Sequence, residues 1–259
     1  DKNSALGGAV PGDKVRFSLA YTAKGELTAR VETIYGSADS ARICADAIID
    51  SAGIPHVFPA EVLAEAESLR ERGISDRERE NREDLREWCI FTIDGRDAKD
   101  LDDAVSLERK GDGWLLGVHI ADVSHYVTAG SALDREAMKR GTSVYFADRV
   151  IPMLPEALSN GLCSLGAGED KLTLSVLLTL DEQGVCRDVR LTKAIIRSKV
   201  RGVYSEINDL FQNTATKEIQ EKYHPVQSSL DAMRLIAGRM REAGEQRGTV
   251  DLISTEAQF

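Results

Sequence analysis

The chain has 259 residues, of which 42% are hydrophobic and 29% charged, and its formal net charge at pH 7 is −10. No apolar run reaches membrane-spanning length and no signal peptide opens the chain, so we expect a cytoplasmic protein without membrane association. The acidic balance argues weakly against a nucleic-acid partner, although a local basic channel can coexist with an acidic whole. The cysteines lack paired spacing, which argues against a disulfide framework or a zinc site; they are Cys44, Cys89, Cys163 and Cys186.

The first third of the chain has the pattern of a hairpin followed by helices. Alternating apolar residues predict strands over 14–20 and 27–34. Helical spacing of apolar residues predicts a helix over 39–52 and a second one over 59–69. The dense charge from 75 to 87 predicts an exposed linker or a short helix.

Beyond Trp88 the pattern changes to strands and then to helices. An apparent new strand begins just before Phe259, and Asp1 is not an initiator Met, so we expect a fragment of something longer. The predicted elements are strands over 89–93, 104–108, 114–120, 172–180 and 185–198, and helices over 131–140, 205–211 and 227–248.

Five carboxylates fall within ten residues, immediately after the apolar stretch that ends at Phe91. Negative charges held this close by a folded backbone repel one another unless a positive charge lies among them. A divalent cation bound by the carboxylate oxygens would offset this repulsion, so the segment is a candidate catalytic metal site. The five residues are Asp94, Asp97, Asp100, Asp102 and Asp103.

Two other interpretations of this segment were weighed. Aspartates in a loop are often turn and cap residues in solvent, but this loop is short and joins two strands, which favours a fixed geometry. A calcium loop is excluded by spacing, because Arg96 and Ala98 stand at the third and fifth positions counted from Asp94. Clustered aspartates suit Mg²⁺, with Mn²⁺ as the alternative.

The segment Ile93-Asp94-Gly95-Arg96-Asp97-Ala98-Lys99-Asp100-Leu101-Asp102-Asp103 resembles the catalytic aspartate motif of the ribonuclease II/R family, the RNB domain. Within that family the residues of the motif are more similar to the ribonuclease R branch, and the resemblance covers residues 79–259. Further segments similar to the family in order and spacing are 117–127, 140–146, 150–155 and 158–165.

The resemblance implies an α+β fold, with a mixed β-sheet core and packed helices, preceded by the end of a small OB-type β-barrel. It implies that residues 1–36 are the C-terminal part of a cold-shock or OB-type RNA-binding domain. Residues 37–78 would then be a helical linker, and residues 79–259 the N-terminal part of a truncated RNB domain.

The resemblance also implies an activity, namely processive 3′-to-5′ hydrolysis of single-stranded RNA to nucleoside 5′-monophosphates. Four aspartates match the family's active-site positions, and Asp97 does not. We expect Asp102 to act in chemistry, by orienting the nucleophilic water, and Tyr145 to bind substrate by stacking on the 3′-terminal base. We expect Mg²⁺ as cofactor, single-stranded RNA as partner and a monomeric protein. The expected metal ligands are Asp94, Asp100 and Asp103.

Family members continue beyond Phe259 into an arginine-rich segment, so we expect this fragment alone to be weak or inactive. One alternative is a non-catalytic RNA-binding or regulatory module with a retired nuclease core, which the four intact aspartates disfavour. Another is a metal-dependent phosphoesterase acting on a substrate other than RNA, which the OB-type remnant and Tyr145 disfavour. RNA and DNA cannot be distinguished from residue spacing.

The remaining polar and aromatic candidates receive structural interpretations. His119 and His125 match no common metal-ligand spacing, so we expect structural roles, with RNA contact left open for His125. Trp114, Tyr126 and Tyr204 are expected to be packing residues. Two interpretations stay open for a basic group at the end of a long strand, a solvated strand end or a phosphate-contacting edge. This group is Lys193, Arg197, Lys199 and Arg201.

Overall fold

The computed structural model describes residues 6–250. The chain divides into two compact units, each made of two segments. The first unit comprises the residues up to 60 together with 136–153, and the second comprises 61–135 and the residues from 154 onward. The strand expected just before Phe259 lies outside the described residues. No helix between residues 6 and 250 has the length and apolar character needed to cross a membrane.

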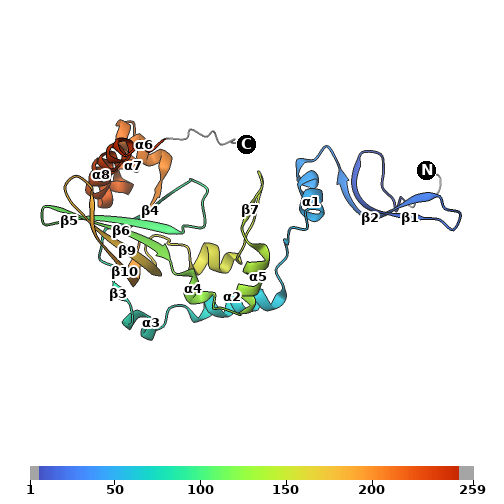
Figure 1. Ribbon diagram of the computed structural model, residues 1–259, viewed down its shortest axis with the longest axis horizontal. Coiled ribbons are helices and arrows are strands. Elements are labelled where there is room, and N and C mark those ends of the chain that lie inside the picture. The colour runs from blue at the N-terminus through green and yellow to red at the C-terminus, as the bar shows by residue number, and fades with distance from the viewer. Residues whose placement is uncertain (1–5, 251–259) are drawn as a thin grey trace. The chain divides into compact units, whose positions relative to one another are not determined.

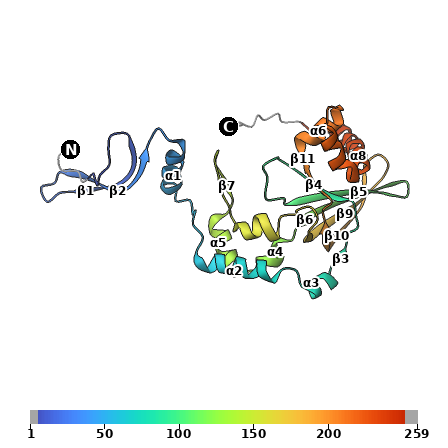
Figure 2. The same cartoon turned by 180° about the vertical axis from the view of Figure 1, so that it is seen from behind.

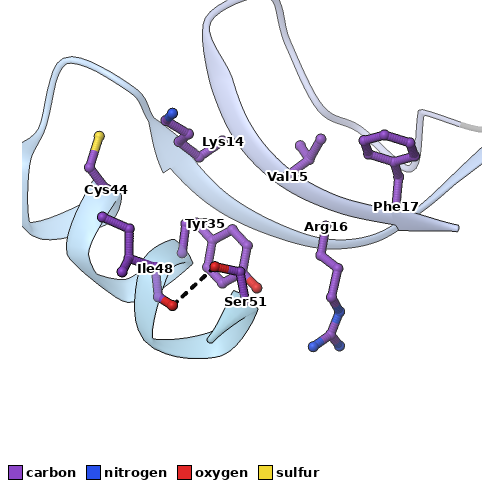
Figure 3. Close-up of a pocket in the computed structure, with 9 residues that line it drawn as sticks. Lys14, Val15, Arg16, Phe17, Tyr35, Cys44, Ile48 and Ser51 are labelled. Carbon is purple, nitrogen blue, oxygen red and sulfur yellow. Dashed lines mark hydrogen bonds between the residues drawn. The ribbon is translucent and has the colours of Figure 1, made fainter. Parts of the chain in front are cut away.

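In the first unit, a two-stranded hairpin lies beside one helix. β1 (Asp13–Tyr21) pairs antiparallel with β2 (Leu27–Ser37), which confirms the predicted hairpin. α1 (Ala41–Ser51) begins two residues later than predicted, because the Ser40 hydroxyl accepts a hydrogen bond from the Ile43 backbone N–H and caps the helix. A cavity of about 400 Å³ between the hairpin and α1 (Figure 3) is lined by residues that include Phe17, Tyr35 and Ile48.

A shorter hairpin belongs to the same unit. β7 (Val144–Tyr145) pairs antiparallel with β8 (Val150–Ile151). It follows α5 (Ala132–Arg140), whose predicted cap is confirmed, because the Ser131 hydroxyl accepts a hydrogen bond from the Asp134 backbone N–H at 3.1 Å. The sequence did not predict this hairpin, since two-residue strands are too short to show a period.

The second unit is built on a seven-stranded sheet that consists of β3 (Glu83–Asp84), β4 (Ile90–Asp94), β5 (Asp103–Lys110), β6 (Gly113–Ala121), β9 (Asp170–Leu180), β10 (Cys186–Arg197) and β11 (Val200–Val203). Their order across the sheet is β11-β4-β5-β6-β9-β10-β3. The β11–β4 and β10–β3 pairs are parallel and the others antiparallel, so the predicted mixed sheet of an α+β fold is confirmed. The two short strands β3 and β11 were not predicted.

α6–α8 gather on one side of this sheet, and α2, α3 and α4 lie toward the opposite side (Figures 1 and 2). The sequence missed α4, α7 and the short π-helical and 3₁₀ segments, because each is shorter than the window in which helical spacing is legible. The helices are α2 (Ala60–Arg72), α3 (Asp76–Glu80), α4 (Val123–Tyr126), α6 (Tyr204–Gln212), α7 (Lys217–Tyr223) and α8 (Gln227–Gln246), with the short segments at Ala157–Leu162 and His224–Val226.

The packing of α6–α8 fixes the position of β4. Phe91 of β4 and Tyr223 of α7 are both fully buried in one apolar cluster. The Tyr223 hydroxyl also accepts a hydrogen bond from the Val203 backbone N–H at 2.8 Å, which ties α7 to the end of β11. β11 in turn approaches β4 so closely that a Cβ on Gly202 would lie 2.4 Å from the Thr92 carbonyl oxygen. Only glycine fits at this position.

A buried ion pair attaches the segment before the sheet to the sheet itself. Arg82 donates to the Asp122 carboxylate at 2.6 Å and to the Thr173 carbonyl oxygen at 3.2 Å. The Arg82 and Asp122 side chains are 4% and 3% exposed. Burial alone would raise the pKa of Asp122, but hydrogen bonds from Arg82 and Ser124 and the charges of Arg82 and Lys193 hold that pKa below its usual value.

We predict that Arg82→Met destabilises the chain by about 3–5 kcal/mol, because it leaves the Asp122 carboxylate buried without its main counter-charge. Chemical denaturation of wild type and variant measures this difference. Arg187→Met is the matched control, since Arg187 pairs with Asp181 while its own side chain is 65% exposed. Arg187→Met should lower the free energy of unfolding by less than about 1 kcal/mol. Equal losses in the two variants would show that burial does not set the importance of the Arg82 pair.

Candidate active site

Asp94 is the last residue of β4, at a point where the sheet opens. β5 pairs with β4 only at Ile90 and Phe91, whereas β11 follows β4 to its end and pairs Val203 with Asp94. β4 and β5 therefore part after Phe91. The segment 95–102, which carries Asp97, Asp100 and Asp102, connects the end of β4 to the start of β5.

The far end of this segment is held by the next strands. Asp103 is the first residue of β5 and pairs with Ile120 of β6. The Asp102 carbonyl oxygen accepts a hydrogen bond from the Ala121 backbone N–H at 2.9 Å. Asp102 and Asp103 are both exposed, although the backbone of Asp103 is in the sheet and that of Asp102 is hydrogen-bonded to the end of β6. The carboxylates thus leave an ordered main chain, as the sequence predicted for a loop joining two strands.

Ser164 holds the middle of the aspartate segment through its side chain. Its hydroxyl accepts a hydrogen bond from the Leu101 backbone N–H at 3.1 Å and donates to the Lys99 carbonyl oxygen at 2.8 Å. The Leu165 backbone N–H donates to the Leu101 carbonyl oxygen at 2.8 Å. Leu101 itself is buried, so Asp100 and Asp102 flank an anchored residue. The backbone beside both carboxylates is therefore fixed by a distant part of the chain.

Arg201 of β11 holds the first part of the segment. One guanidinium nitrogen donates to the carbonyl oxygens of Arg96 and Ala98, both at 2.7 Å. Its positive charge also opposes the rise in the pKa of Asp94 that burial and the neighbouring aspartates cause. Sequence reasoning identified Arg201 only as part of a basic group, and missed Ser164 as an anchor. Neither role has a local signature, because each residue is far along the chain from the segment it holds.

The four aspartates that match the family motif act on one another electrostatically. Burial raises the pKa of Asp94, and the charges of Asp103 and Asp100 raise it further against the opposing effects of Thr92 and Arg201. Partial burial likewise raises the pKa of Asp102, and so do the charges of Asp100, Asp103 and Asp94. Mutual repulsion of this kind favours binding of a cation. Asp97 contributes to neither shift and is exposed.

One oxygen atom in this cluster is unsatisfied. Asp94 Oδ2 is buried and has no hydrogen-bond partner. A buried carboxylate oxygen without a partner is costly, and a divalent cation would satisfy it. Across residues 6–250 no three acidic, histidine or cysteine side chains are arranged to hold a metal ion by themselves. The donor set fits Mg²⁺ rather than a closed protein cage, because Mg²⁺ commonly keeps waters and substrate phosphate oxygens among its ligands.

The expected substrate residue Tyr145 belongs to the first unit, whereas the four aspartates belong to the second. Its side chain is 66% exposed on β7. The two histidines have the structural surroundings that we expected. His119 is fully buried and its ring nitrogens lie 3.0 and 2.8 Å from the Ser106 and Ser175 hydroxyls. His125 pairs with the carboxylate of Glu78.

The packing role expected for Tyr204 is wrong, while the one expected for Tyr126 is confirmed. Tyr126 is 2% exposed, but Tyr204 is 61% exposed. Tyr204 is the first residue of α6 and directly follows Val203, the residue paired with Asp94. Its exposure comes from its place at the start of a helix, where β11 ends, and the single sequence carries no signal for this position.

The basic group at the end of β10 is engaged in contacts within the protein. Arg197 donates to Asp170 at 2.7 Å, and Lys193 lies 3.7 Å from Asp122. Lys199 donates to the Arg86 carbonyl oxygen at 3.1 Å. Together with the contacts of Arg201, these bonds favour a structural role over a phosphate-contacting edge.

Comparison with known proteins decides the family. Residues 82–259 match the RNB domain family. The chain belongs to the RNB domain family. A ribonuclease R of Thermotoga maritima is 41% identical over 259 residues, an alignment that covers 98% of this chain and 36% of the relative. The predicted resemblance to the ribonuclease R branch is therefore confirmed.

Solved structures agree with this assignment. The RNase R of Mycoplasma genitalium, in complex with ribose-methylated single-stranded RNA, matches this RNB chain with a TM-score of 0.86 at 29% identity. That match covers 97% of this chain and 39% of the other. A yeast protein described as a pseudonuclease shares the fold, with a TM-score of 0.65 at 17% identity over 90% of this chain and 28% of its own. The chain thus spans less than half the length of the relatives it matches.

We predict that Asp102→Asn raises the melting temperature in EDTA by about 1–3 °C, because it removes one of four mutually repelling charges. The folded-state pKa values of Asp94 and Asp102 lie above their usual values, so this cost of ionisation is present at neutral pH. It is relieved as the pH falls through the carboxyl range, where the difference should shrink. Thermal melts at several pH values measure it.

Asp97→Asn is the matched control for this measurement, because Asp97 lies in the same loop and does not shift the pKa of Asp94 or Asp102. Adding Mg²⁺ should raise the melting temperature of wild type more than that of Asp102→Asn. A lower melting temperature for Asp102→Asn in EDTA would contradict the repulsion.

Proposed function

We propose that this RNB chain is the part of a processive 3′-to-5′ exoribonuclease that carries its aspartate cluster. The substrate would be single-stranded RNA and the products nucleoside 5′-monophosphates. The observation that carries the proposal is a set of four mutually repelling carboxylates on an anchored backbone, with a buried and unsatisfied oxygen on Asp94. Membership of the RNB domain family supports it as well.

In this proposal Asp94, Asp100 and Asp103 would hold divalent metal ions, Mg²⁺ first and Mn²⁺ as the alternative. When bound, such ions lower the pKa of a water and neutralise charge on the leaving oxygen. The side chains would provide oxygen ligands from three fixed backbone positions. The order of the backbone matters because ligands held in place by hydrogen bonds and packing need little reorganisation on binding.

Asp102 would orient the attacking water. Its side chain is exposed, in contrast to the half-buried Asp94, so substrate and water can reach it. The raised pKa brings it nearer to the range in which a carboxylate exchanges protons efficiently. Hydrogen bonding by Ala121 to the Asp102 carbonyl oxygen keeps the residue in one position.

The first unit would contact the RNA strand. Tyr145 offers an exposed ring for stacking, a contact that tolerates any base. We further propose that residues 1–36 end an OB-type RNA-binding domain, 37–78 form a helical linker and 79–259 begin the RNB domain. Exposed residues at alternate positions of β1 support the first of these assignments, namely Phe17, Leu19 and Tyr21. The similar RNase R of Mycoplasma genitalium was solved in complex with ribose-methylated single-stranded RNA, which also supports contact with RNA.

We also propose that the protein is a monomer that acts in the cytoplasm, where its RNA substrate is found. The free thiols of all four cysteines support a reducing compartment.

The proposal is tested with the full-length parent protein and 5′-labelled single-stranded RNA and DNA, with and without Mg²⁺. We expect shortening of RNA alone, in Mg²⁺ alone, to a very short limit product without intermediate lengths. The isolated chain should be weak or inactive, because it spans about a third of the Thermotoga relative. Equal cutting of DNA would overturn the substrate assignment, and RNA binding without cutting would support a retired nuclease core.

We predict that Asp102→Asn in the full-length parent binds RNA normally and lowers kcat at least about a hundredfold, since it removes the group that orients the attacking water. Filter binding and single-turnover kinetics separate the two effects. The control is Asp97→Asn in the same loop, which should retain activity. Normal turnover by Asp102→Asn would refute its chemical role.

Tyr145→Ala should alter the length of the limit product more than it alters the affinity for long RNA. Stacking is worth about 1–3 kcal/mol per base, and on a long RNA one lost contact is a small part of the total. Denaturing gels of the end products, alongside binding measurements on the same RNA, test this. A limit product of unchanged length would remove Tyr145 from the substrate site.

A further inference from the structure

The hairpin that carries Tyr145 depends on anchors outside itself. Its strands β7 and β8 share only two residue pairs, Val144 with Ile151 and Tyr145 with Val150. Beyond them, the Phe146 backbone N–H donates to the Arg149 carbonyl oxygen at 2.8 Å. An isolated ribbon this short is not stable in water, so the direction in which Tyr145 projects must come from contacts with the rest of the first unit.

The base of the hairpin is held by Arg140, whose side chain is only 2% exposed. Arg140 donates to the Glu136 carboxylate at 2.9 Å and to the Pro152 carbonyl oxygen at 3.1 Å. Its guanidinium also lies 3.6 Å from the centre of the Phe58 ring. These contacts fix the two ends of the hairpin but do not reach its tip.

An ion pair joins the tip of the hairpin to α1. Arg149 donates to the Asp46 carboxylate, and its guanidinium lies 5.9 Å from the ring of Phe146, the residue after Tyr145. Arg149 also lies 3.9 Å from the carboxylate of Asp148 within the tip, so the pair with Asp46 is its contact with α1. The Arg149 and Asp46 side chains are 25% and 42% exposed, so the pair is partly accessible to water.

The surroundings of Arg149 favour Asp46 as its partner on α1. A cavity of about 690 Å³ extends between β2, α1 and the hairpin, so packed side chains do not hold the tip there. Asp50 lies one helical turn after Asp46 on the same face of α1, but its carboxylate already accepts hydrogen bonds from Arg16 and Tyr35. Asp46 is therefore the α1 carboxylate that remains for Arg149.

We infer that Arg149 and Asp46 are positioning residues for Tyr145, and that their ion pair sets the length of RNA at which degradation stops. The pair fixes the tip of the hairpin and with it the ring that stacks on the last base. The inference rests on the proposed function, because it concerns how Tyr145 meets an RNA end. It adds a determinant of product length that lies on α1, outside the aspartate cluster.

The test uses the full-length parent with Arg149→Met, with Asp46→Asn, and with the exchanged pair Asp46→Arg/Arg149→Asp. Both single variants should shift the limit product in the same direction as Tyr145→Ala, while kcat on long RNA stays within about twofold of wild type. The exchanged pair should restore the wild-type product. Adding Arg149→Met to Tyr145→Ala should change the product no further, because the ring to be positioned is already absent.

Asp39→Asn is the control, since Asp39 precedes α1 and its only described bond is from its backbone N–H to the Ser37 side chain. It should leave product length unchanged. Wild-type products from both single variants, with a shifted product from Tyr145→Ala, would overturn the inference and leave the proposed function standing. An unchanged product from Tyr145→Ala would overturn it too. An inactive wild-type parent would refute the proposed function itself, and the inference with it.

Discussion

Confinement of four negative charges to one edge of a sheet is the constraint on which the second unit depends. Carboxylates in a free loop would move apart, but here both ends of the segment are strand residues and its middle is bonded to Ser164 and Arg201. The repulsion therefore persists, and together with burial, the larger cause, it raises the pKa of Asp94 and Asp102. Such a site favours a cation for two reasons. A bound cation would offset the repulsion among the carboxylates, and the fixed backbone would need little rearrangement.

The sheet and its helices serve this confinement. Two contacts fix the position of β4 and therefore of Asp94 at its end. Phe91 is buried under α6–α8, and Gly202 lets β11 approach the Thr92 carbonyl oxygen. The early separation of β4 from β5 creates the space that the acidic segment occupies. At the other side of the sheet, the buried pair of Arg82 and Asp122 secures the chain that enters it. The geometry of the candidate site thus derives from packing at some distance from the carboxylates.

The proposed chemistry and the proposed contact with the RNA end are assigned to different units. The aspartates lie in the second unit, while Tyr145 lies on a hairpin whose anchors, Arg140 and Asp46, belong to the first. Under the proposed function, such a division would let changes in the first unit alter where degradation stops without altering the four aspartates. The inferred positioning role is compatible with the partial exposure of the Arg149–Asp46 pair, because orienting a side chain does not require a large contribution to stability.

The sequence by itself determined the five long strands of the sheet, most of the helices and the acidic segment, because each has a local period or a local density of charge, and the class of fold followed from the resemblance to the RNB domain. It also separated Asp97 from the other four through the family motif. Tertiary structure alone decided that Ser164 and Arg201 hold the segment, that Tyr204 is exposed beside Asp94, and that Arg149 pairs with Asp46. The physical reason is that these contacts join residues far apart in the chain. A local sequence pattern does not specify which distant side chain will contact a given segment.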